Sequence, residues 1–447
     1  MGLVVVGAAV FAIVAHAVPP ITNEPASPPI TDEPASPPTG TTTGAWPPPR
    51  PRLAPYLSTL NLWGGGILQP GALVASDPLS STAASIKSEL ARVGINYALY
   101  QSFQMAAMSD RIQGDAVISA YSFEMLGSLS LFHLDALGGT DAWIAAEFDG
   151  GQGLGIDWTT QSPDTNIGAM TATDYVWWAD DIFISQLSWA QSFLDGRLVV
   201  IAGVVDQTNY FDTNAYANSG FGQLQNRAFV ESQVLPDPAG TLGFNIQWQP
   251  VDCFYLLVGA SANRYDGSEA FNSDLSPRDL SALAEIGFVV PDVAGLGPGT
   301  YRIQPFVVSI DGDMGGGVGF NFQQQLGAKS PLGLFGRFGI GTETTAASNG
   351  AGAVAQASGG LALLSPFADK GPFSAANNDY AAIAFKWTRA PSSPFNIHDD
   401  EFALEATYAM QLTPTAVLQP DLQLVWDPAS SPRDFAVVFQ LSINLRW

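Results

Sequence analysis

Two histidine sites have the residue types of a hydrolytic centre. His133 lies two residues before Asp135, and His398 is followed directly by Asp399 and Asp400. An imidazole beside a carboxylate becomes catalytic only when a nucleophile or a further orienting group lies within hydrogen-bond reach. Both histidines fall at the ends of predicted strands or in loops. The sequence therefore favours solvated loop positions for them, and we expect no catalytic residue.

A metal centre is not expected either. The segment 311–315 begins like a calcium loop but lacks the third oxygen ligand and the distal glutamate that such a loop requires. The single cysteine rules out an internal disulfide framework and a cysteine-rich metal site, and three histidines leave little material for a zinc centre. We predict neither a metal nor a cofactor.

A polar segment near the middle of the chain offers a different chemistry. Asp206, Asp212 and Asn214 follow the end of a predicted strand and enter a connection long enough to fold inward. Arg197 and Arg227 could pair with these carboxylates or donate hydrogen bonds to hydroxyl groups. Ordinary turn chemistry explains Asp212 and Asn214 equally well, and it is favoured for Arg197, which follows an Asp-Gly pair.

The composition limits the class of protein. The 447 residues are 47% hydrophobic and 11% aromatic but only 13% charged, which is about half the usual charged share of a soluble protein. With 17 Lys and Arg against 41 Asp and Glu, the net charge is −24. A chain with this balance cannot neutralise a row of phosphates, so a nucleic-acid partner is not expected.

The first 93 residues divide into three predicted segments. Residues 1–17 combine an apolar core with a small-x-small Ala-His-Ala end, which indicates a signal peptide too short to span a bilayer. Residues 18–55 are a Pro-rich linker in which the nine-residue segment 21–29 returns almost unchanged at 30–38, and such a sequence favours a polyproline II spacer. Residues 56–93 form a pre-barrel segment with a helix at 79–93, capped by the hydroxyl residues 80–82 and ended by Gly94.

From residue 94 to 447 the hydrophobic pattern has period two. In the last segment Phe435, Phe439 and Ile443 share one face with other apolar residues, while Gln440 and Asn444 lie on the opposite face. After the first 17 residues no run of eighteen apolar residues occurs, so a helical membrane protein is not expected. We predict sixteen strands, at 94–105, 117–132, 142–149, 183–193, 197–206, 241–249, 253–262, 281–290, 300–309, 317–326, 332–342, 354–364, 379–389, 400–413, 416–426 and 435–447.

The environment of these strands follows from what each face carries. A soluble sandwich also alternates, so the pattern alone does not choose between water and lipid. The apolar faces, however, end repeatedly in Trp or Tyr, as membrane-interface girdles do, and the polar faces are rich in Gln, Asn, Glu and Arg. The predicted fold class is all-β, a transmembrane antiparallel β-barrel of about 16 strands with an aqueous interior.

The barrel region resembles the carbohydrate-selective porins of the OprB family in about a dozen blocks spread over residues 57–447. Among these blocks are Ser-Gln-Leu-Ser-Trp at 185–189, Tyr-Phe-Asp-Thr-Asn at 210–214, Gly-Leu-Phe-Gly-Arg-Phe-Gly at 333–339 and Leu-Gln-Pro-Asp-Leu-Gln at 418–423. The resemblance implies an outer-membrane channel of a Gram-negative-type bacterium that passes monosaccharides, glucose among them, by diffusion. It also implies contact with outer-membrane lipid and recognition of the last strand, ending at Trp447, by the outer-membrane assembly machinery.

A sugar pore needs donors and acceptors that match hydroxyl groups, and an apolar surface for the ring. Trp189 and Tyr210 could stack on a pyranose. Further pore-lining candidates on the inferred lumen faces are Glu147, Arg302, Arg337 and Glu405, beside Arg197, Asp206, Asp212, Asn214 and Arg227. For any single wall residue a generic solvated position is the favoured interpretation.

Three alternatives stay open at this point. A general, weakly selective porin would have the same architecture, an outer-membrane barrel hydrolase would need a histidine paired across adjacent strands, and a secreted β-rich adhesin would be soluble without detergent. The sequence is compatible with a monomer and with a trimer.

Overall fold

The computed structural model describes residues 72–74, 77–134, 140–154, 162–175, 182–236, 238, 240–263, 275–327, 330–348, 352–366 and 378–447. The predicted signal peptide and Pro-rich linker lie outside these residues. Among the described helices, none has both the length and the apolar content to cross a membrane.

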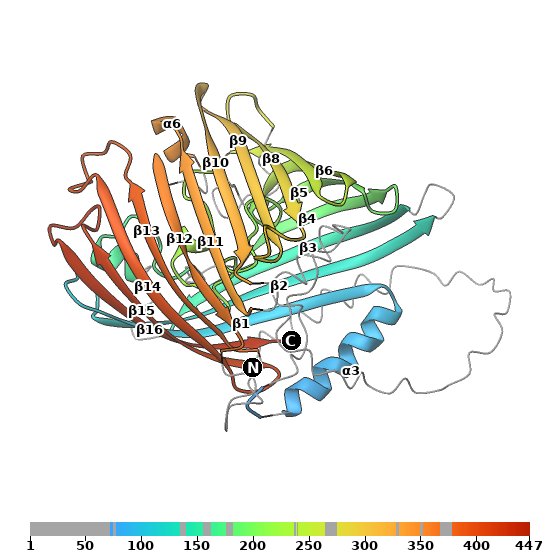
Figure 1. Cartoon of the computed structure of the whole chain (residues 1–447), viewed down its shortest axis with the longest axis horizontal. Coiled ribbons are helices and arrows are strands. Elements are labelled where there is room, and N and C mark those ends of the chain that lie inside the picture. Colours follow the sequence, from blue (N-terminus) through green and yellow to red (C-terminus); the bar gives the residue numbers. More distant parts are fainter. Residues whose placement is uncertain are drawn as a thin grey trace. The chain divides into compact units, whose positions relative to one another are not determined.

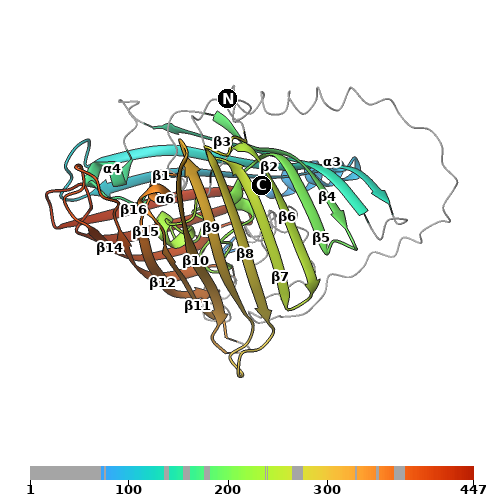
Figure 2. The same cartoon turned by 90° about the horizontal axis from the view of Figure 1, so that it is seen from above.

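Sixteen antiparallel strands close into one barrel (Figures 1 and 2). Each strand pairs with its neighbours in sequence, and the last strand returns to pair with the first, Met105 facing Leu441. The strands are β1 (Ile95–Met108), β2 (Val117–Leu134), β3 (Thr140–Gly153), β4 (Ile182–Phe193), β5 (Leu198–Val205), β6 (Thr241–Val251), β7 (Phe254–Ala262), β8 (Leu280–Val290), β9 (Gly299–Ile310), β10 (Asp313–Gln325), β11 (Leu332–Ile340), β12 (Ala355–Leu364), β13 (Tyr380–Arg389), β14 (Asp400–Gln411), β15 (Ala416–Trp426) and β16 (Phe435–Arg446). The predicted barrel and all sixteen predicted segments are confirmed.

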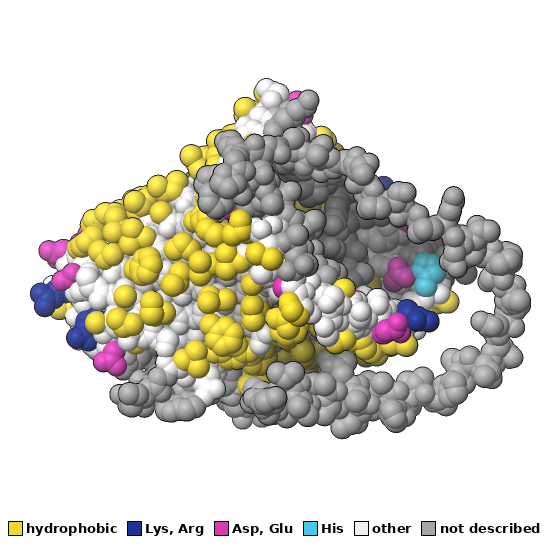
Figure 3. Space-filling view, turned by 90° about the horizontal axis from the view of Figure 1, so that it is seen from below, with side chains coloured by type: hydrophobic (Ala, Val, Ile, Leu, Met, Phe, Trp, Pro, Cys, Tyr) yellow, Lys and Arg dark blue, Asp and Glu magenta, His cyan; other side chains and the backbone are white. Residues whose placement is uncertain are grey.

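The alternation of the sequence decides which side chains face the lumen. In β16 the polar side chains of Gln440, Ser442 and Asn444 are buried inside the barrel, whereas Phe439 and Ile443 are exposed on its outer surface. The same arrangement, with polar side chains inside and apolar ones outside, holds along β14 and β15, where Glu405 and Gln423 are fully buried. An outer surface covered by Phe, Leu, Ile and Val is stable only against an apolar phase. Figure 3 shows this apolar surface on one side of the barrel.

Aromatic residues mark the ends of the outward faces. Trp248 on β6 is 45% exposed, and Tyr301 at the start of β9 stacks on Phe322, with ring centroids 6.4 Å apart. At the opposite end of the barrel the Trp387 indole donates a hydrogen bond of 2.8 Å to Asp400. An apolar ring with a polar tip suits the boundary between hydrocarbon and water, so the predicted girdle is present at both ends.

The β9–β10 connection is a two-residue hairpin. Asp311 (φ 52°) and Gly312 (φ 95°) join β9 to β10, and both occupy the left-handed region that the tight turns between antiparallel strands require. The aspartates that open the calcium-like segment 311–315 are thus a turn residue and the first residue of β10.

A helix precedes the barrel. It is α3 (Pro78–Arg92), and it packs against β1 (Figure 1). Asp77 rather than residues 80–82 provides the N-cap: its Oδ1 accepts a hydrogen bond of 2.7 Å from the Ser80 amide, and Pro78 fits the first helical position. Gly94 follows with φ 81°, as its predicted role in ending the helix requires. The other carboxylate oxygen of Asp77 accepts a hydrogen bond from the Thr415 hydroxyl in the β14–β15 turn, at 3.0 Å.

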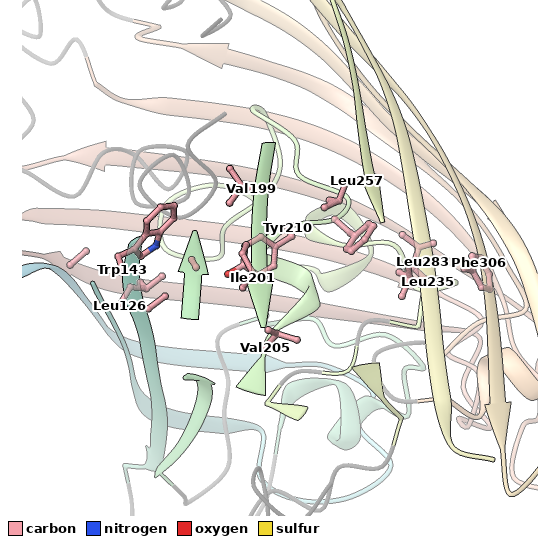
Figure 4. Packing of buried hydrophobic residues seen from close by; sticks show 14 of the residues in the cluster. Leu126, Trp143, Val199, Ile201, Val205, Tyr210, Leu235, Leu257, Leu283 and Phe306 are labelled. Atoms are coloured by element: carbon pink, nitrogen blue, oxygen red, sulfur yellow. The ribbon is translucent and has the colours of Figure 1, made fainter. Parts of the chain in front are cut away.

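Two connections fold into the barrel instead of away from it. Residues 162–175 contain α4 (Pro163–Ile167), and residues 206–240 contain the 3-10 turn η2 (Gln207–Asn209) and the short helix α5 (Arg227–Val230). Their apolar side chains pack on apolar wall residues: Tyr210 and Leu235 of the second connection cluster with Ile201, Leu257 and Leu283 of the wall (Figure 4). We call residues 206–240 the inner loop. A third short helix, α6 (Glu343–Ala346), lies in the β11–β12 connection.

Candidate functional site

The inner loop begins with a capped turn at the end of β5. The Asp206 carboxylate accepts hydrogen bonds from the amide and hydroxyl of Thr208, at 2.8 and 2.7 Å. Burial raises the pKa of Asp206 to about 6, against the lowering effect of the Thr208 hydrogen bond. Asn209 donates from Nδ2 to the Glu147 carboxylate on β3, and the Tyr210 hydroxyl accepts a hydrogen bond of 2.6 Å from Gln186 on β4. These contacts attach the start of the loop to the β3–β4 wall.

Asp212 is the central anchor of the loop. Its Oδ2 lies 2.7 Å from Arg337 Nε on β11, and both side chains are almost completely buried. The same oxygen accepts the Ser232 amide at 2.7 Å, and Oδ1 accepts Asn321 Nδ2 at 2.6 Å. Asp212 has φ 57°, a conformation that Asp and Asn tolerate better than most residues. One carboxylate therefore ties two parts of the loop to the barrel wall.

Arg337 completes this anchor from the wall. Its Nη2 donates to the backbone carbonyls of Asp212 and Ala217, both at 2.9 Å, and its Nη1 donates to the carbonyl of Phe229. A planar guanidinium can serve carboxylate and carbonyl acceptors at once. Arg337 thus gathers the first, middle and last parts of the inner loop on a single side chain.

A second buried ion pair lies beside the first. Arg302 Nε on β9 is 3.5 Å from Glu285 Oε1 on β8, and it donates to the Tyr255 hydroxyl at 2.9 Å. Glu285 also accepts the backbone amide of Asp212 at 3.0 Å. The two ion pairs form one connected polar network, in which the charges have partners and the cost of burying them is offset.

The next part of the loop packs through Asn214 and Tyr216. Asn214 Nδ2 donates to Asn321 Oδ1 at 2.9 Å and to the Phe322 carbonyl at 3.0 Å. The Tyr216 ring lies over Gly333 on β11, where an added Cβ would come within 2.0 Å of the ring. Glycine is required there by this close approach.

Glu405 holds the far side of the loop. Its two carboxylate oxygens accept the backbone amides of Gln225 and Asn226, at 2.6 and 2.9 Å, and its side chain is fully buried. Asn226 Nδ2 donates to Gln423 Oε1 at 3.0 Å. The inner loop is therefore attached to opposite parts of the wall, to β8–β11 and to β14–β15.

The other inward connection is fixed by a buried lysine. Lys386 Nζ on β13 lies 2.6 Å from Glu401 Oε1 on β14, and both side chains are 0% exposed. Lys386 also donates to the Thr171 hydroxyl, and Glu401 Oε2 accepts the Met170 amide at 2.6 Å. Gln440 donates to the Thr173 carbonyl at 2.9 Å.

A cleft lies where the two inward connections meet. It encloses about 250 Å³, counting its open side, and it is lined by Tyr175, Thr208, Phe211, Asp212, Asn218, Val230 and Glu231. Arg227 Nε lies 3.0 Å from Glu231 Oε2, and the Tyr175 hydroxyl donates to Glu231 Oε1. Burial and the adjacent Glu231 carboxylate raise the pKa of Tyr175 well above its ordinary value. The tyrosine is therefore a neutral donor at all physiological pH values.

Two predicted pore residues lie elsewhere. Trp189 is on the outer face of β4, 44% exposed, with its ring 6.3 Å from that of Phe132. Arg197 lies in the β4–β5 turn and contacts the neighbouring turn, with Nη2 3.4 Å from Asp252 Oδ1 and Nη1 3.2 Å from the Pro250 carbonyl. These two pore assignments are wrong, and the turn interpretation of Arg197 describes its position.

The remaining predicted residues are brought together inside the barrel. Glu147, Arg302, Arg337 and Glu405 on the wall contact the inner loop directly or through one residue. The loop residues are Asp206, Tyr210, Asp212, Asn214 and Arg227. The sequence analysis did not identify Tyr175, Glu231 or Glu285. Tyr175 and Glu231 lie in segments without alternation, and Glu285 is one of many acidic residues on polar strand faces.

The histidines occupy the rim of the barrel. His133 Nδ1 lies 2.7 Å from Asp141 Oδ1 across the β2–β3 pair, and both side chains are 55% exposed. The nearby Ser192 hydroxyl accepts a hydrogen bond from the Asp141 backbone amide at 3.1 Å, so this serine is directed at the backbone of the aspartate. His398 lies in the β13–β14 connection, with its amide bonded to the Ala429 carbonyl at 3.1 Å.

Comparison with known proteins agrees with this architecture. A family model described as carbohydrate-selective porin, OprB family, matches residues 311–445. The high-pH structure of Pseudomonas putida OprB is similar over 85% of this chain and 100% of that chain, with a TM-score of 0.65 and 17% identity, and the low-pH structure gives 0.50 and 16% over the same shares. A variant of the Rh. blastica porin covers 79% of this chain and 100% of its own, with a TM-score of 0.46 and 10% identity. None of the curated proteins matches the chain.

The family match and the structural match cover different parts of the chain. The resemblance to the carbohydrate-selective porins of the OprB family is confirmed by the family model in the C-terminal third of the chain. The likeness to the solved OprB structure shows that the fold of the whole barrel is a porin fold.

Proposed function

We propose that this protein is an outer-membrane porin through which small carbohydrates, monosaccharides such as glucose, diffuse passively. The observation that carries the proposal is an apolar-outside, polar-inside barrel of sixteen strands whose lumen is narrowed by a loop fixed on buried ion pairs. A closed barrel of this size has an aqueous interior, and an inward loop narrows that interior enough for its lining groups to contact a solute. The match to the carbohydrate-selective porin family supports the same solute class.

The cleft between the two inward connections offers both kinds of contact that a passing sugar needs. Tyr175 and Phe211 supply apolar surface, and Thr208, Asn218 and Glu231 supply hydroxyl, amide and carboxylate groups. Weak, exchangeable contacts of this kind let a solute enter and leave again. Asp206, Tyr210, Asp212, Asn214, Glu147, Arg302, Arg337 and Glu405 then act chiefly by fixing the loop that forms the cleft.

A channel accounts for the polar residues better than an enzyme does. The exposed His133–Asp141 pair is at the rim, away from the buried network, and Ser192 contacts the backbone of Asp141. A general, weakly selective porin is the principal alternative, and it differs from the proposal only in whether the cleft binds sugar. A detergent-free soluble adhesin is disfavoured by the apolar outer surface.

The ends of the chain fit export and insertion. We propose that residues 1–17 direct export, and that residues 18–55 form a spacer ahead of α3. The last residue, Trp447, continues the pairing of β16 with β1, because its amide donates to the Leu99 carbonyl at 2.9 Å. Its indole donates to Gln101 Oε1 at 3.0 Å. A paired aromatic C-terminus is the element that assembly machinery would recognise in the unpaired state, before the barrel closes.

The test is sugar-dependent block of ion current through single channels in planar bilayers. Replacing Glu231 by Gln removes the carboxylate from the cleft, and Glu343→Gln removes a matched carboxylate on α6, outside the cleft. One lost hydrogen bond, worth roughly 0.5–1.5 kcal/mol, would raise the glucose concentration for half block about 2- to 12-fold in E231Q. E343Q should behave like the native channel. Equal block of all three channels would show that the cleft is not the sugar contact, and absence of block in the native channel would favour the general porin.

A further inference from the structure

Three carboxylates face one another inside the wall, next to the start of the inner loop. Glu147 and Asp149 are two residues apart on β3 and therefore project to the same face. Glu124 on β2 is the register partner of Asp149. One carboxylate oxygen from each residue lies within 4.8 Å of those of the other two. Oxygens bound to one calcium ion at 2.3–2.6 Å are at most about 5 Å apart, so a single cation could contact all three.

Among the described residues these carboxylates lack the arginine or lysine partner that the buried Glu285 and Glu401 have. Glu124 and Asp149 are only 2% and 5% exposed. Glu124 Oε1 and Asp149 Oδ1 are buried and accept no hydrogen bond from any residue that the structure describes. Within the part of the chain that the structure describes, none of the three acids forms an ion pair, whereas Glu285 is paired with Arg302 and Glu401 is paired with Lys386.

We infer that Glu124, Glu147 and Asp149 form a binding site for a divalent cation of the calcium type. The three side chains offer only hard oxygen ligands, which Ca²⁺ prefers, and one buried oxygen each of Glu124 and Asp149 accepts no hydrogen bond among the described residues. A bound cation would supply the positive charge that the adjacent wall lacks, in place of the Arg and Lys found elsewhere in the lumen. This site is separate from the sugar cleft and does not depend on which solute the channel passes.

The position of the site gives the ion a structural consequence. Glu147 also accepts the hydrogen bond from Asn209 of η2, so a cation held by Glu147 stiffens the attachment of the inner loop to the β2–β3 wall. Second contacts that orient a metal-bound carboxylate in this way are common in metal sites. The cation should therefore stabilise the folded barrel as a whole.

The experiment is Ca²⁺ binding to the refolded full chain in detergent after EDTA treatment, by equilibrium dialysis and by calorimetry. We expect one Ca²⁺ per chain at Ca²⁺ concentrations up to about 1 mM, and a higher temperature for heat modification of the barrel when Ca²⁺ is present. E124Q/D149N should lose both effects. D427N/D434N is the matched control, because it removes the acids of the partly exposed His398 group instead.

Two results would overturn the inference: no Ca²⁺ bound by the native chain, or equal binding by E124Q/D149N. The first would mean that the three carboxyl groups are accommodated by sharing protons. If the double variant does not fold, E147Q tests the cation site instead, because Gln keeps one oxygen and the shape of the Glu side chain. It should weaken Ca²⁺ binding at least about tenfold while the barrel still shows heat modification, and unchanged affinity would contradict the site.

Discussion

Asp212→Asn should weaken the attachment of the inner loop without disturbing the strand pairing of the barrel. Asn has the shape of Asp and tolerates the left-handed φ of 57° at this position, so the change removes charge without backbone strain. Both carboxylate oxygens accept hydrogen bonds: Oδ2 from Arg337 and the Ser232 backbone amide, and Oδ1 from the Asn321 and Gln304 side chains. Whichever way the new amide is oriented, its NH2 group faces a donor.

The size of the effect follows from the burial of the pair. Arg337 and Asp212 are 1% and 3% exposed, and removing one partner of such an ion pair costs about 3–5 kcal/mol because the other charge is left uncompensated. Since about 1.4 kcal/mol corresponds to a factor of ten, the fraction of molecules with a released loop should rise roughly 10²- to 4 × 10³-fold. The strand pairing of the barrel is untouched by this change, so heat modification should persist.

Trypsin provides the assay, because Arg227 is the only lysine or arginine in residues 206–240. Cleavage after Arg227 should be slow in the native barrel and faster in D212N by the factor given above, as long as reclosing is fast relative to cleavage. Asp195→Asn is the matched control: Asp195 also has a positive φ, 54°, but it lies in the exposed β4–β5 turn. Equal cleavage rates in D212N, D195N and native barrels would refute the idea that Asp212 anchors the loop.

Three further perturbations test other contacts. E401Q should lower the free energy of unfolding by about 3–5 kcal/mol because Lys386 is left buried without its counter-charge, and K386M/E401Q should regain part of that loss in urea titrations of the vesicle-bound barrel. G333A should lower the free energy of unfolding by about 1–3 kcal/mol, because its Cβ would lie 2.0 Å from the Tyr216 ring. Y216A in the same chain should relieve the clash. Equal stability of the native and G333A barrels would contradict this packing. The pKa of Asp206 rises from 3.8 to about 6 on folding, so the folded barrel binds this proton more tightly than the unfolded chain does. Asp206 therefore lowers the free energy of unfolding progressively as the pH rises from about 4 to 6, and by about 3 kcal/mol at higher pH. D206N, measured in EDTA, should therefore be more stable than the native barrel at pH 7.5 and equal to it near pH 4; a pH-independent difference would exclude this origin.

The strands could be predicted from sequence because one local rule governs them. Lipid on one side and water on the other impose period two, and strands such as β14, β15 and β16 carry that pattern along most of their length. The faces of Arg337, Glu405 and Arg302 followed from the same rule. Asp77 is the N-cap of α3 and Pro78 takes the first helical position, so the predicted cap residues 80–82 lie inside the first turns of the helix.

Trp189 is assigned to the pore from sequence because its ring could stack on a sugar, and its exposed position on β4 contradicts that assignment. The pairing of β3 with β4 shifts register between Glu147 and Phe148, and Ser185 and Gln186 are consecutive buried residues in β4. Such a bulge reverses the phase of the alternation, so every later residue of β4 changes face and Trp189 points outward. The bulge depends on the partner strand and cannot be read from β4 alone.

The contacts of the inner loop are also beyond local rules. Asp212 and Arg337 are 125 residues apart, and Glu405 and Gln225 are 180 apart. The loop has turn-forming residues and no periodicity, so the sequence indicates that it is long enough to fold inward but not which wall residues receive it. Identifying a carboxylate as a loop anchor or a cation ligand required the barrel to be closed first.

The central claim, that the barrel passes small sugars selectively, is tested most directly by the swelling of liposomes that contain the refolded chain. Glucose should enter quickly, and a sucrose-sized sugar and a small amino acid should enter slowly, because the amino acid is small enough to pass but does not match the contacts of the cleft. Entry ranked only by solute size, with the amino acid faster than glucose, would contradict the sugar-selective account and leave a general pore.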